Sequence, residues 1–371
     1  MLGSEGVGNG TKRPLSLGSL MKKKKQAALD IEPTESITVP QGDNDMEDLE
    51  AIHSHSIKLL YEKDFEQAKT YARACIHECD RIARLNEEEE SLPLQFYEIF
   101  GSALFLLATC DADADCDLYK SNNQLRLEHR DLIEAAIERF ELGLEEYPDA
   151  ESFSQHIAIA KVRLQAITHN WYLKKAEYNP EEQFISTLTA YHEALNKLQD
   201  KMTVYERIFS FSEELIRCVE FIEQVDLVRI YFSEALKLYR LASKAIENEK
   251  DVSQEELEIY YESLCDEADC LVQWGLWTLN KGSDIDSFTK KLEKALKVLD
   301  NAEVIAQESQ ISSNNHLRIM AETLIHLGNN CVEEDSETYL QKAVDCIRIL
   351  EQREGSLSED LVEFIAEMEE E

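Results

Sequence analysis

The chain has 371 residues, with 75 acidic and 38 basic side chains and a formal charge of −37 at pH 7. This charge argues against direct binding of nucleic acid or anionic lipid, because Lys and Arg hold such ligands by displacing counterions. No run approaches the ~18 consecutive apolar residues of a membrane span. The composition therefore favours a soluble protein that holds a basic partner protein.

Glycine and proline are concentrated near the N-terminus. Six of the 12 glycines lie in residues 1–42, and no proline follows Pro180. Strands in an all-β protein need turn residues every ~8–12 positions, whereas long helices need only short breaks. The body of the chain is therefore predicted to be all-α.

In chain order, residues 1–45 are rich in Gly, Ser and Pro and are predicted to form a disordered tail. Residues 46–371 are predicted to form one helical repeat domain of about a dozen helices. Breaks between helices are expected near Glu87–Pro93, Asp111–Asn123, Tyr147–Glu151, Tyr178–Glu181, Lys250–Gln254, Lys281–Asp286, Gln307–Asn315 and Glu333–Ser336. The final segment is expected to begin at Ser358, which would act as a cap.

Small and aromatic residues follow the spacing of a tetratricopeptide repeat. The second-helix pattern is present at Ala136, Phe140, Gly143 and Pro148. The matching first-helix pattern is present at Tyr97, Phe100, Gly101 and Leu104. Because similar patterns recur at irregular intervals, the predicted fold is a degenerate tetratricopeptide-like α-solenoid of helix pairs. A helical bundle with accidental Ala and Gly spacing is the alternative.

Sequence motifs of enzymes and metal sites are incomplete. The segment from His129 to Leu132 resembles the start of a kinase catalytic loop, but Ala136 stands where the metal-binding Asn is required. The pair His129 and Asp131 could also open an iron site, although a helix N-terminus explains it more simply. None of the nine cysteines forms a C-x-x-C motif. We therefore expect no catalytic activity, no cofactor and no metal, with an enzyme of unfamiliar arrangement as a remote alternative.

A basic segment precedes the acidic body. Its charged residues are Lys12, Arg13, Lys22, Lys23, Lys24 and Lys25. Four consecutive lysines on a flexible tail can lie extended in an acidic groove such as that of importin-α. The segment is therefore predicted to be a nuclear import signal, in which Lys22–Lys25 contribute most.

A second charged segment lies within a predicted helix, Ile76–Leu85. Helical spacing directs Ala72, Cys75, Cys79 and Ile82 inward and places a charged stripe on the opposite side. The predicted stripe consists of His77, Asp80, Arg81 and Arg84. It is either a solvated face with weak ion pairs or a surface that binds a partner.

These two segments resemble those of the fungal enhancer-of-translation-termination family, which includes the negative regulator of an Ofd-type 2-oxoglutarate oxygenase. The resemblance rests on Lys12–Gly18 with the following lysines, and on the His-Glu-Cys-Asp-Arg sequence that begins at His77. Ten additional residues, Met1–Gly10, precede the basic motif in this chain.

The resemblance implies a nuclear, tetratricopeptide-like adaptor without catalytic activity, expected to be monomeric when alone. Its implied partners are an Ofd-type oxygenase and importin-α. By binding the oxygenase, such an adaptor would restrain oxygen-dependent turnover of a sterol-regulatory transcription factor and would affect translation termination. The resemblance assigns no residues to the oxygenase contact. The alternative is a generic co-chaperone adaptor for an acidic C-terminal peptide, which the strong negative charge disfavours.

Overall fold

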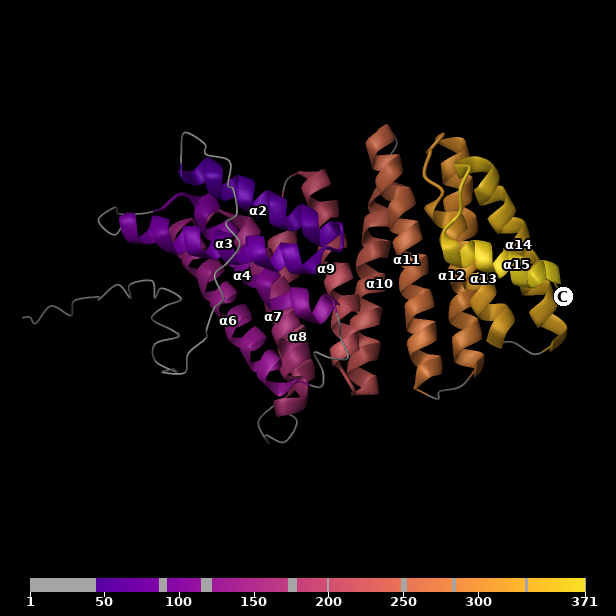
Figure 1. Ribbon diagram of the computed structural model, residues 1–371, viewed down its shortest axis with the longest axis horizontal. Helices are drawn as coiled ribbons and strands as arrows, with labels where there is room; N and C mark the ends of the chain where they lie inside the picture. Colours follow the sequence, from indigo (N-terminus) through magenta and orange to yellow (C-terminus); the bar gives the residue numbers. More distant parts are fainter. Residues whose placement is uncertain are drawn as a thin grey trace, which may run out of the picture. The chain divides into compact units, whose positions relative to one another are not determined.

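The computed structural model describes residues 45–86, 92–114, 122–172, 179–198, 200–247, 252–281, 285–330 and 333–370. Helices and short connections account for all of these residues, and none of them forms a strand (Figure 1). None of the described helices combines the length and the apolar character needed to span a membrane. The chain divides into two units, Met1–His156 and Ile157–Glu371. The predicted boundary between a tail and a domain at residue 45 stays a prediction, because residues 1–44 lie outside the described ranges.

Unit 1 stacks its helices in chain order. They are α2 (Asp45–Tyr61), α3 (Phe65–Leu85), α4 (Leu94–Ala114), α6 (Asn123–Glu146) and the first residues of α7 (Glu151–Tyr172). Helix α2 packs on α3, α3 on α4, and α4 on α6. Side-chain caps fix two of the helix starts: Asp64 accepts a hydrogen bond from the Gln67 amide (3.2 Å), and Asn122 accepts one from the Leu125 amide (3.1 Å).

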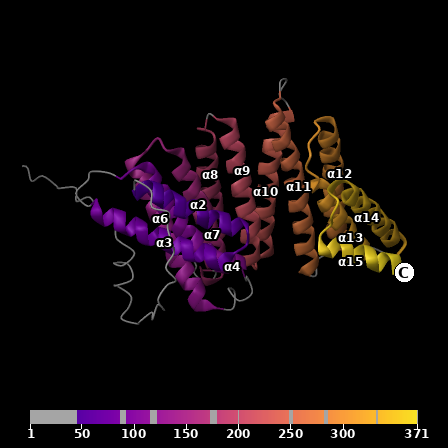
Figure 2. The same cartoon turned by 45° about the horizontal axis from the view of Figure 1, so that its top comes forward.

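Unit 2 continues this sequential packing. Its elements after α7 are α8 (Pro180–Leu195), α9 (Lys201–Cys218), the 3₁₀ turn η1 (Val219–Phe221), α10 (Val225–Glu247), α11 (Gln254–Asn280), α12 (Ile285–Glu308), α13 (Asn315–Asn330), α14 (Glu333–Glu354) and α15 (Glu359–Glu370). Each helix from α9 to α13 packs on the next one, which Figure 2 shows from a second direction. Helix α11 also contacts α9 and α13, so these three alternate helices form one layer.

Glycines bring consecutive helices close together, as the repeat pattern predicts. A Cβ atom at Gly101 of α4 would overlap the ring of Phe140 in α6. At Gly143 it would overlap the ring of Phe153, and at Gly328 the side chain of Leu340. The aromatic and the small residues of the pattern therefore contact each other between helices. This packing of helix pairs confirms the predicted all-α, tetratricopeptide-like fold.

The predicted breaks at Tyr147–Glu151, Lys250–Gln254 and Gln307–Asn315 fall between consecutive helices, but the breaks between α8 and α9 and between α9 and α10 were not predicted. The break expected near Glu333–Ser336 is displaced, because α13 ends at Asn330 and residues 333–336 already form the first turn of α14. The turn between α2 and α3 was not predicted. It contains neither Gly nor Pro, and Lys63 adopts the left-handed conformation there (φ 60°).

Candidate partner-binding surfaces

The described residues do not include the predicted import signal. Lys12, Arg13 and Lys22–Lys25 all precede residue 45. Their role therefore stays a prediction from the sequence.

The charged stripe of α3 is narrower than predicted. His77, Arg81 and Arg84 are exposed, at the i, i+4, i+7 spacing of one helix face. Arg81 donates to Glu78 (Nε–Oε1 2.9 Å) and to Asp45 of α2 (Nη2–Oδ1 2.6 Å). These two hydrogen bonds raise the pKa of Arg81 above its ordinary value. Arg81 therefore links the start of α2 to α3.

Asp80 corrects the predicted stripe, because it is buried (8 % exposed). Helix α3 packs against both α2 and α4, so its buried arc extends around the helix to Ile76 and Asp80. Burial lowers the pKa of the nearby Arg139, and the charge of Asp80 opposes that shift. The side chain of Asp80 therefore belongs to the interior of unit 1 and not to the exposed stripe. Its backbone carbonyl accepts a hydrogen bond from Arg84 Nε of the stripe (3.0 Å).

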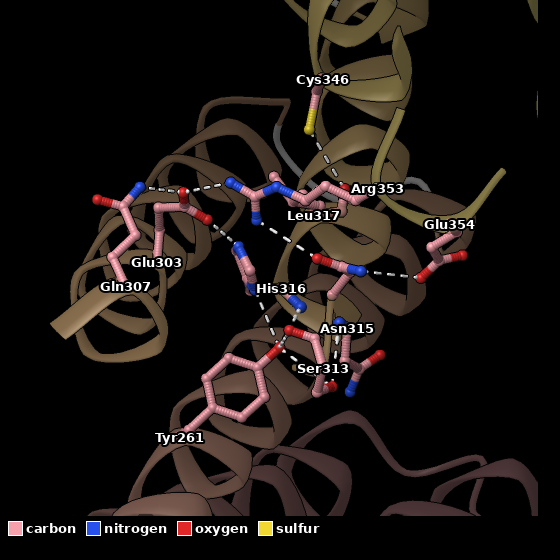
Figure 3. A network of polar contacts seen from close by, with 11 residues as sticks. Tyr261, Glu303, Gln307, Ser313, Asn315, His316, Leu317, Cys346, Arg353 and Glu354 are labelled. Carbon is pink, nitrogen blue, oxygen red and sulfur yellow. Dashed lines mark hydrogen bonds and ion pairs between the residues drawn. The ribbon is translucent and has the colours of Figure 1, made fainter. Parts of the chain in front are cut away.

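A buried polar network connects four helices of unit 2 (Figure 3). His316 at the start of α13 lies between Tyr261 of α11 (Oη–Nδ1 2.9 Å) and Glu303 of α12, and its side chain is completely buried. Arg353 of α14 donates to Glu303 (3.1 Å) and to Asn314 (3.3 Å). Burial lowers the pKa of His316, and Glu303 opposes the shift. The network fixes the positions of these helices relative to one another.

Sequence reasoning missed this network because its members are far apart in the chain. Tyr261, Glu303 and His316 come from three helices, and no local spacing connects them. The only sequence signal is the presence of a histidine at the N-terminus of a helix, which is common. Among the described residues, no group of three or more His, Cys, Asp or Glu side chains is arranged to hold a metal ion.

An acidic face on α11 is the other feature that sequence reasoning missed. Glu262, Asp266 and Asp269 follow one another at i, i+4 and i+7, and all three are half-buried. Burial, together with the smaller effect of the charges of Glu262, Glu213 and Asp269, raises the pKa of Asp266 to about 7. Burial likewise raises the pKa values of Asp269 and Glu262. We define these three residues of α11 as the acidic face.

Removing one charge from the acidic face is expected to stabilise the protein. The pKa of Asp266 is about 7 in the folded protein, against an ordinary value of 3.8. Ionisation therefore costs folding free energy as the pH rises above ~4, and the cost is complete above ~8. Since one pKa unit equals ~1.4 kcal/mol, Asp266→Asn should gain roughly 2–4 kcal/mol at pH 8 and almost nothing at pH 4.

Urea-induced unfolding, followed by circular dichroism at pH 4.5 and pH 8, measures this gain. The control is Asp300→Asn, which neutralises an exposed carboxylate on α12. A gain in stability for Asp266→Asn that is the same at both pH values would show that burial and neighbouring carboxylates do not raise the pKa of Asp266.

Comparison with known proteins gives the family context. The profile of the family described as "Nuclear pore complex subunit Nro1" matches residues 10–237. "Enhancer of translation termination 1" of Saccharomyces cerevisiae (strain ATCC 204508 / S288c) is 22% identical over 385 aligned residues, which cover 90% of this chain and 88% of that protein. The protein of the same name from Meyerozyma guilliermondii is 30% identical over 169 residues, 42% of this chain and 37% of that protein. The solved structure of the S. pombe nuclear import adaptor Nro1 has a TM-score of 0.45 at 18% identity, over 87% of this chain and 98% of that one.

Proposed function

The chain belongs to the family of nuclear pore complex subunit Nro1, and we propose that it is a non-catalytic nuclear adaptor that binds an Ofd-type 2-oxoglutarate oxygenase. The observation that carries this proposal is the family match over residues 10–237, which includes both the basic segment and the α3 stripe. Full-length relatives named for enhanced translation termination support a second effect of the same adaptor, on stop-codon fidelity.

The geometry supports docking by a helical scaffold. Stacked helix pairs expose one long face of each helix, and consecutive faces form an extended surface for a partner. The exposed residues His77, Arg81 and Arg84 of α3 give unit 1 such a charged face. We assign the oxygenase contact to this stripe, where ion pairs add to the buried apolar area and make binding weaker at high salt.

In this function the import signal carries the oxygenase into the nucleus. Lys22–Lys25 would bind importin-α while the helices hold the oxygenase. By holding the enzyme, the adaptor would restrain oxygen-dependent turnover of a sterol-regulatory transcription factor. A co-chaperone role is less well supported, because capture of an acidic peptide needs a basic clamp. The layer formed by α9, α11 and α13 carries the acidic face instead.

Nuclear import in permeabilised cells tests the proposal. Fluorescent oxygenase should accumulate in nuclei only when importins and the full chain are both added. The variant in which Lys22, Lys23, Lys24 and Lys25 are replaced by Ala should abolish accumulation. The matched control Lys12→Ala/Arg13→Ala should retain most of it, because the four consecutive lysines bind the importin groove.

A pull-down at ~0.15 M salt separates binding from transport. The four-lysine variant should still capture the oxygenase as well as the unchanged chain does. Absence of capture by the unchanged chain would reject the oxygenase as a partner. Undiminished import with the four-lysine variant would place the signal in another segment.

A further inference from the structure

One side of α12 is cationic, although the chain as a whole is strongly acidic. At ~100° per residue, all the lysines of this helix fall within ~120° of its circumference. Three of them follow the i, i+4, i+7 spacing and are exposed, and the fourth is half-buried beside them. We define these residues as the cationic face: Lys290, Lys294 and Lys297, with Lys291 at the edge.

The cationic face has no carboxylate of its own to neutralise it. Within the described ranges, none of its lysines forms an ion pair, although Glu293 lies four positions before Lys297 on the same helix. By contrast, the exposed Lys237 of α10 pairs with Glu234 three positions before it (2.5 Å). The lysines of the cationic face can therefore pair with carboxylates of another molecule without first breaking an ion pair.

Packing against a tryptophan holds Lys291 in place. Its ammonium group lies over the ring of Trp274 in α11 (5.0 Å to the centroid) and donates to the hydroxyl of Ser287 (2.7 Å). The ring of Trp274 stacks on Phe232 of α10 (centroids 5.6 Å apart), and α11 packs on both α10 and α12 (Figure 1). Burial lowers the pKa of Lys291, and the charge of Arg229 in α10 lowers it further. One cation of the face is thus already ordered, which reduces the entropy lost when an anion binds.

The spacing of the cationic face suits a short acidic segment. The three exposed lysines span ~10.5 Å along α12. Side chains on one side of an extended peptide repeat every ~6.6 Å, so two or three carboxylates of one segment reach these lysines together. A long nucleic acid is disfavoured, because its many phosphates would also meet the acidic remainder of the chain, whose net charge is −37.

We propose that the cationic face of α12 binds a segment of a partner protein that is rich in Asp and Glu. Carboxylates of the segment pair with Lys290, Lys294 and Lys297, and one of them also accepts a hydrogen bond from Lys291. Lysines act here as separate point charges along one helix, so the segment needs no free C-terminal carboxylate. The inference goes beyond the proposed adaptor function, which assigns the oxygenase contact to α3 of unit 1.

Fluorescence anisotropy of the full chain tests the proposal at ~50 mM salt, where screening is weak. The probe is a labelled peptide of roughly ten residues, with alternating Glu and Ser and an amidated C-terminus, long enough to span the lysines. The variant Lys290→Gln/Lys294→Gln/Lys297→Gln should bind it ~10-fold more weakly than the unchanged chain, because three ion pairs are lost. Lys291→Met, which keeps an apolar side chain against Trp274, should weaken binding ~3-fold.

The matched control is Lys237→Gln/Lys244→Gln/Lys342→Gln, which removes the same charge from exposed positions on α10 and α14. It should change the affinity less than ~2-fold, and circular dichroism confirms that the variants fold. Equal losses in the α12 triple variant and this control would overturn the site in favour of diffuse attraction. Absence of binding by the unchanged chain would overturn it too. Binding only to a peptide with a free C-terminal carboxylate would indicate a C-terminal clamp instead, and tighter binding of a single-stranded RNA that is lost in the α12 variant would assign the face to nucleic acid.

Discussion

Replacing Glu214 by Gln is expected to lower the free energy of unfolding by about 3–5 kcal/mol, the largest effect of any single change considered for unit 2. Glu214 of α9 pairs with Arg163 of α7, and both side chains are almost completely buried (5% and 2% exposed). A second contact joins Arg163 Nη2 to Glu214 Oε2 at 3.1 Å, so the pair is bidentate. The variant leaves the guanidinium buried without its countercharge, whereas the amide keeps the volume of the carboxylate.

Urea-induced unfolding of the full chain measures this loss. The control is Asp226→Asn, which breaks an exposed pair with Arg229 (3.5 Å) and should cost less than ~1 kcal/mol. The double variant Arg163→Met/Glu214→Leu should recover most of the stability, because a buried ion pair can be replaced by apolar residues of similar size. Similar small losses for Glu214→Gln and the control would show that the pair does not hold α7 to α9.

Replacing Gly101 by Ala is expected to destabilise unit 1 by about 1–3 kcal/mol, although Ala is the better helix former. The added methyl group would overlap the ring of Phe140, which is 2 % exposed and also packs against Phe153 (centroids 6.5 Å apart). A rigid ring in a filled core cannot move aside without shifting α6 relative to α4.

A double-mutant cycle isolates this contact. Phe140→Leu removes the ring, so Gly101→Ala should cost at least ~1 kcal/mol less in the Phe140→Leu background. The comparison variant is Gly275→Ala, whose methyl group would meet the flexible end of Leu292 and should cost less. Additive effects of the two unit 1 changes would contradict the close approach of α4 and α6 at this point.

Local patterns predict much of the fold. The repeat pattern singled out both Gly101 and Phe140, and the structure shows that they contact each other, because close approach of two helices requires a residue without a side chain at one of them. The turn at Lys63 escaped prediction because its left-handed residue is neither Gly nor Asn. The buried Asp80 escaped because its burial depends on helices packing on two sides of α3, which one helical period does not reveal.

The surfaces were less predictable than the fold. The half-buried carboxylates of α11 are regular in sequence, but acidic residues at helical spacing are common in a chain of this charge. Their partial burial distinguishes this face from an ordinary solvated one, and it depends on the helices that pack against α11. The import signal depends on residues outside the described ranges, so its prediction rests on the sequence and the family alone.

Hydrogen exchange of the full chain, with and without saturating oxygenase, tests the adaptor account most directly. Docking on the helices predicts slower exchange in the amides of α3, around His77 and Arg81, with unchanged exchange in the buried network around His316. Exchange that is identical with and without the oxygenase at every amide would contradict the account.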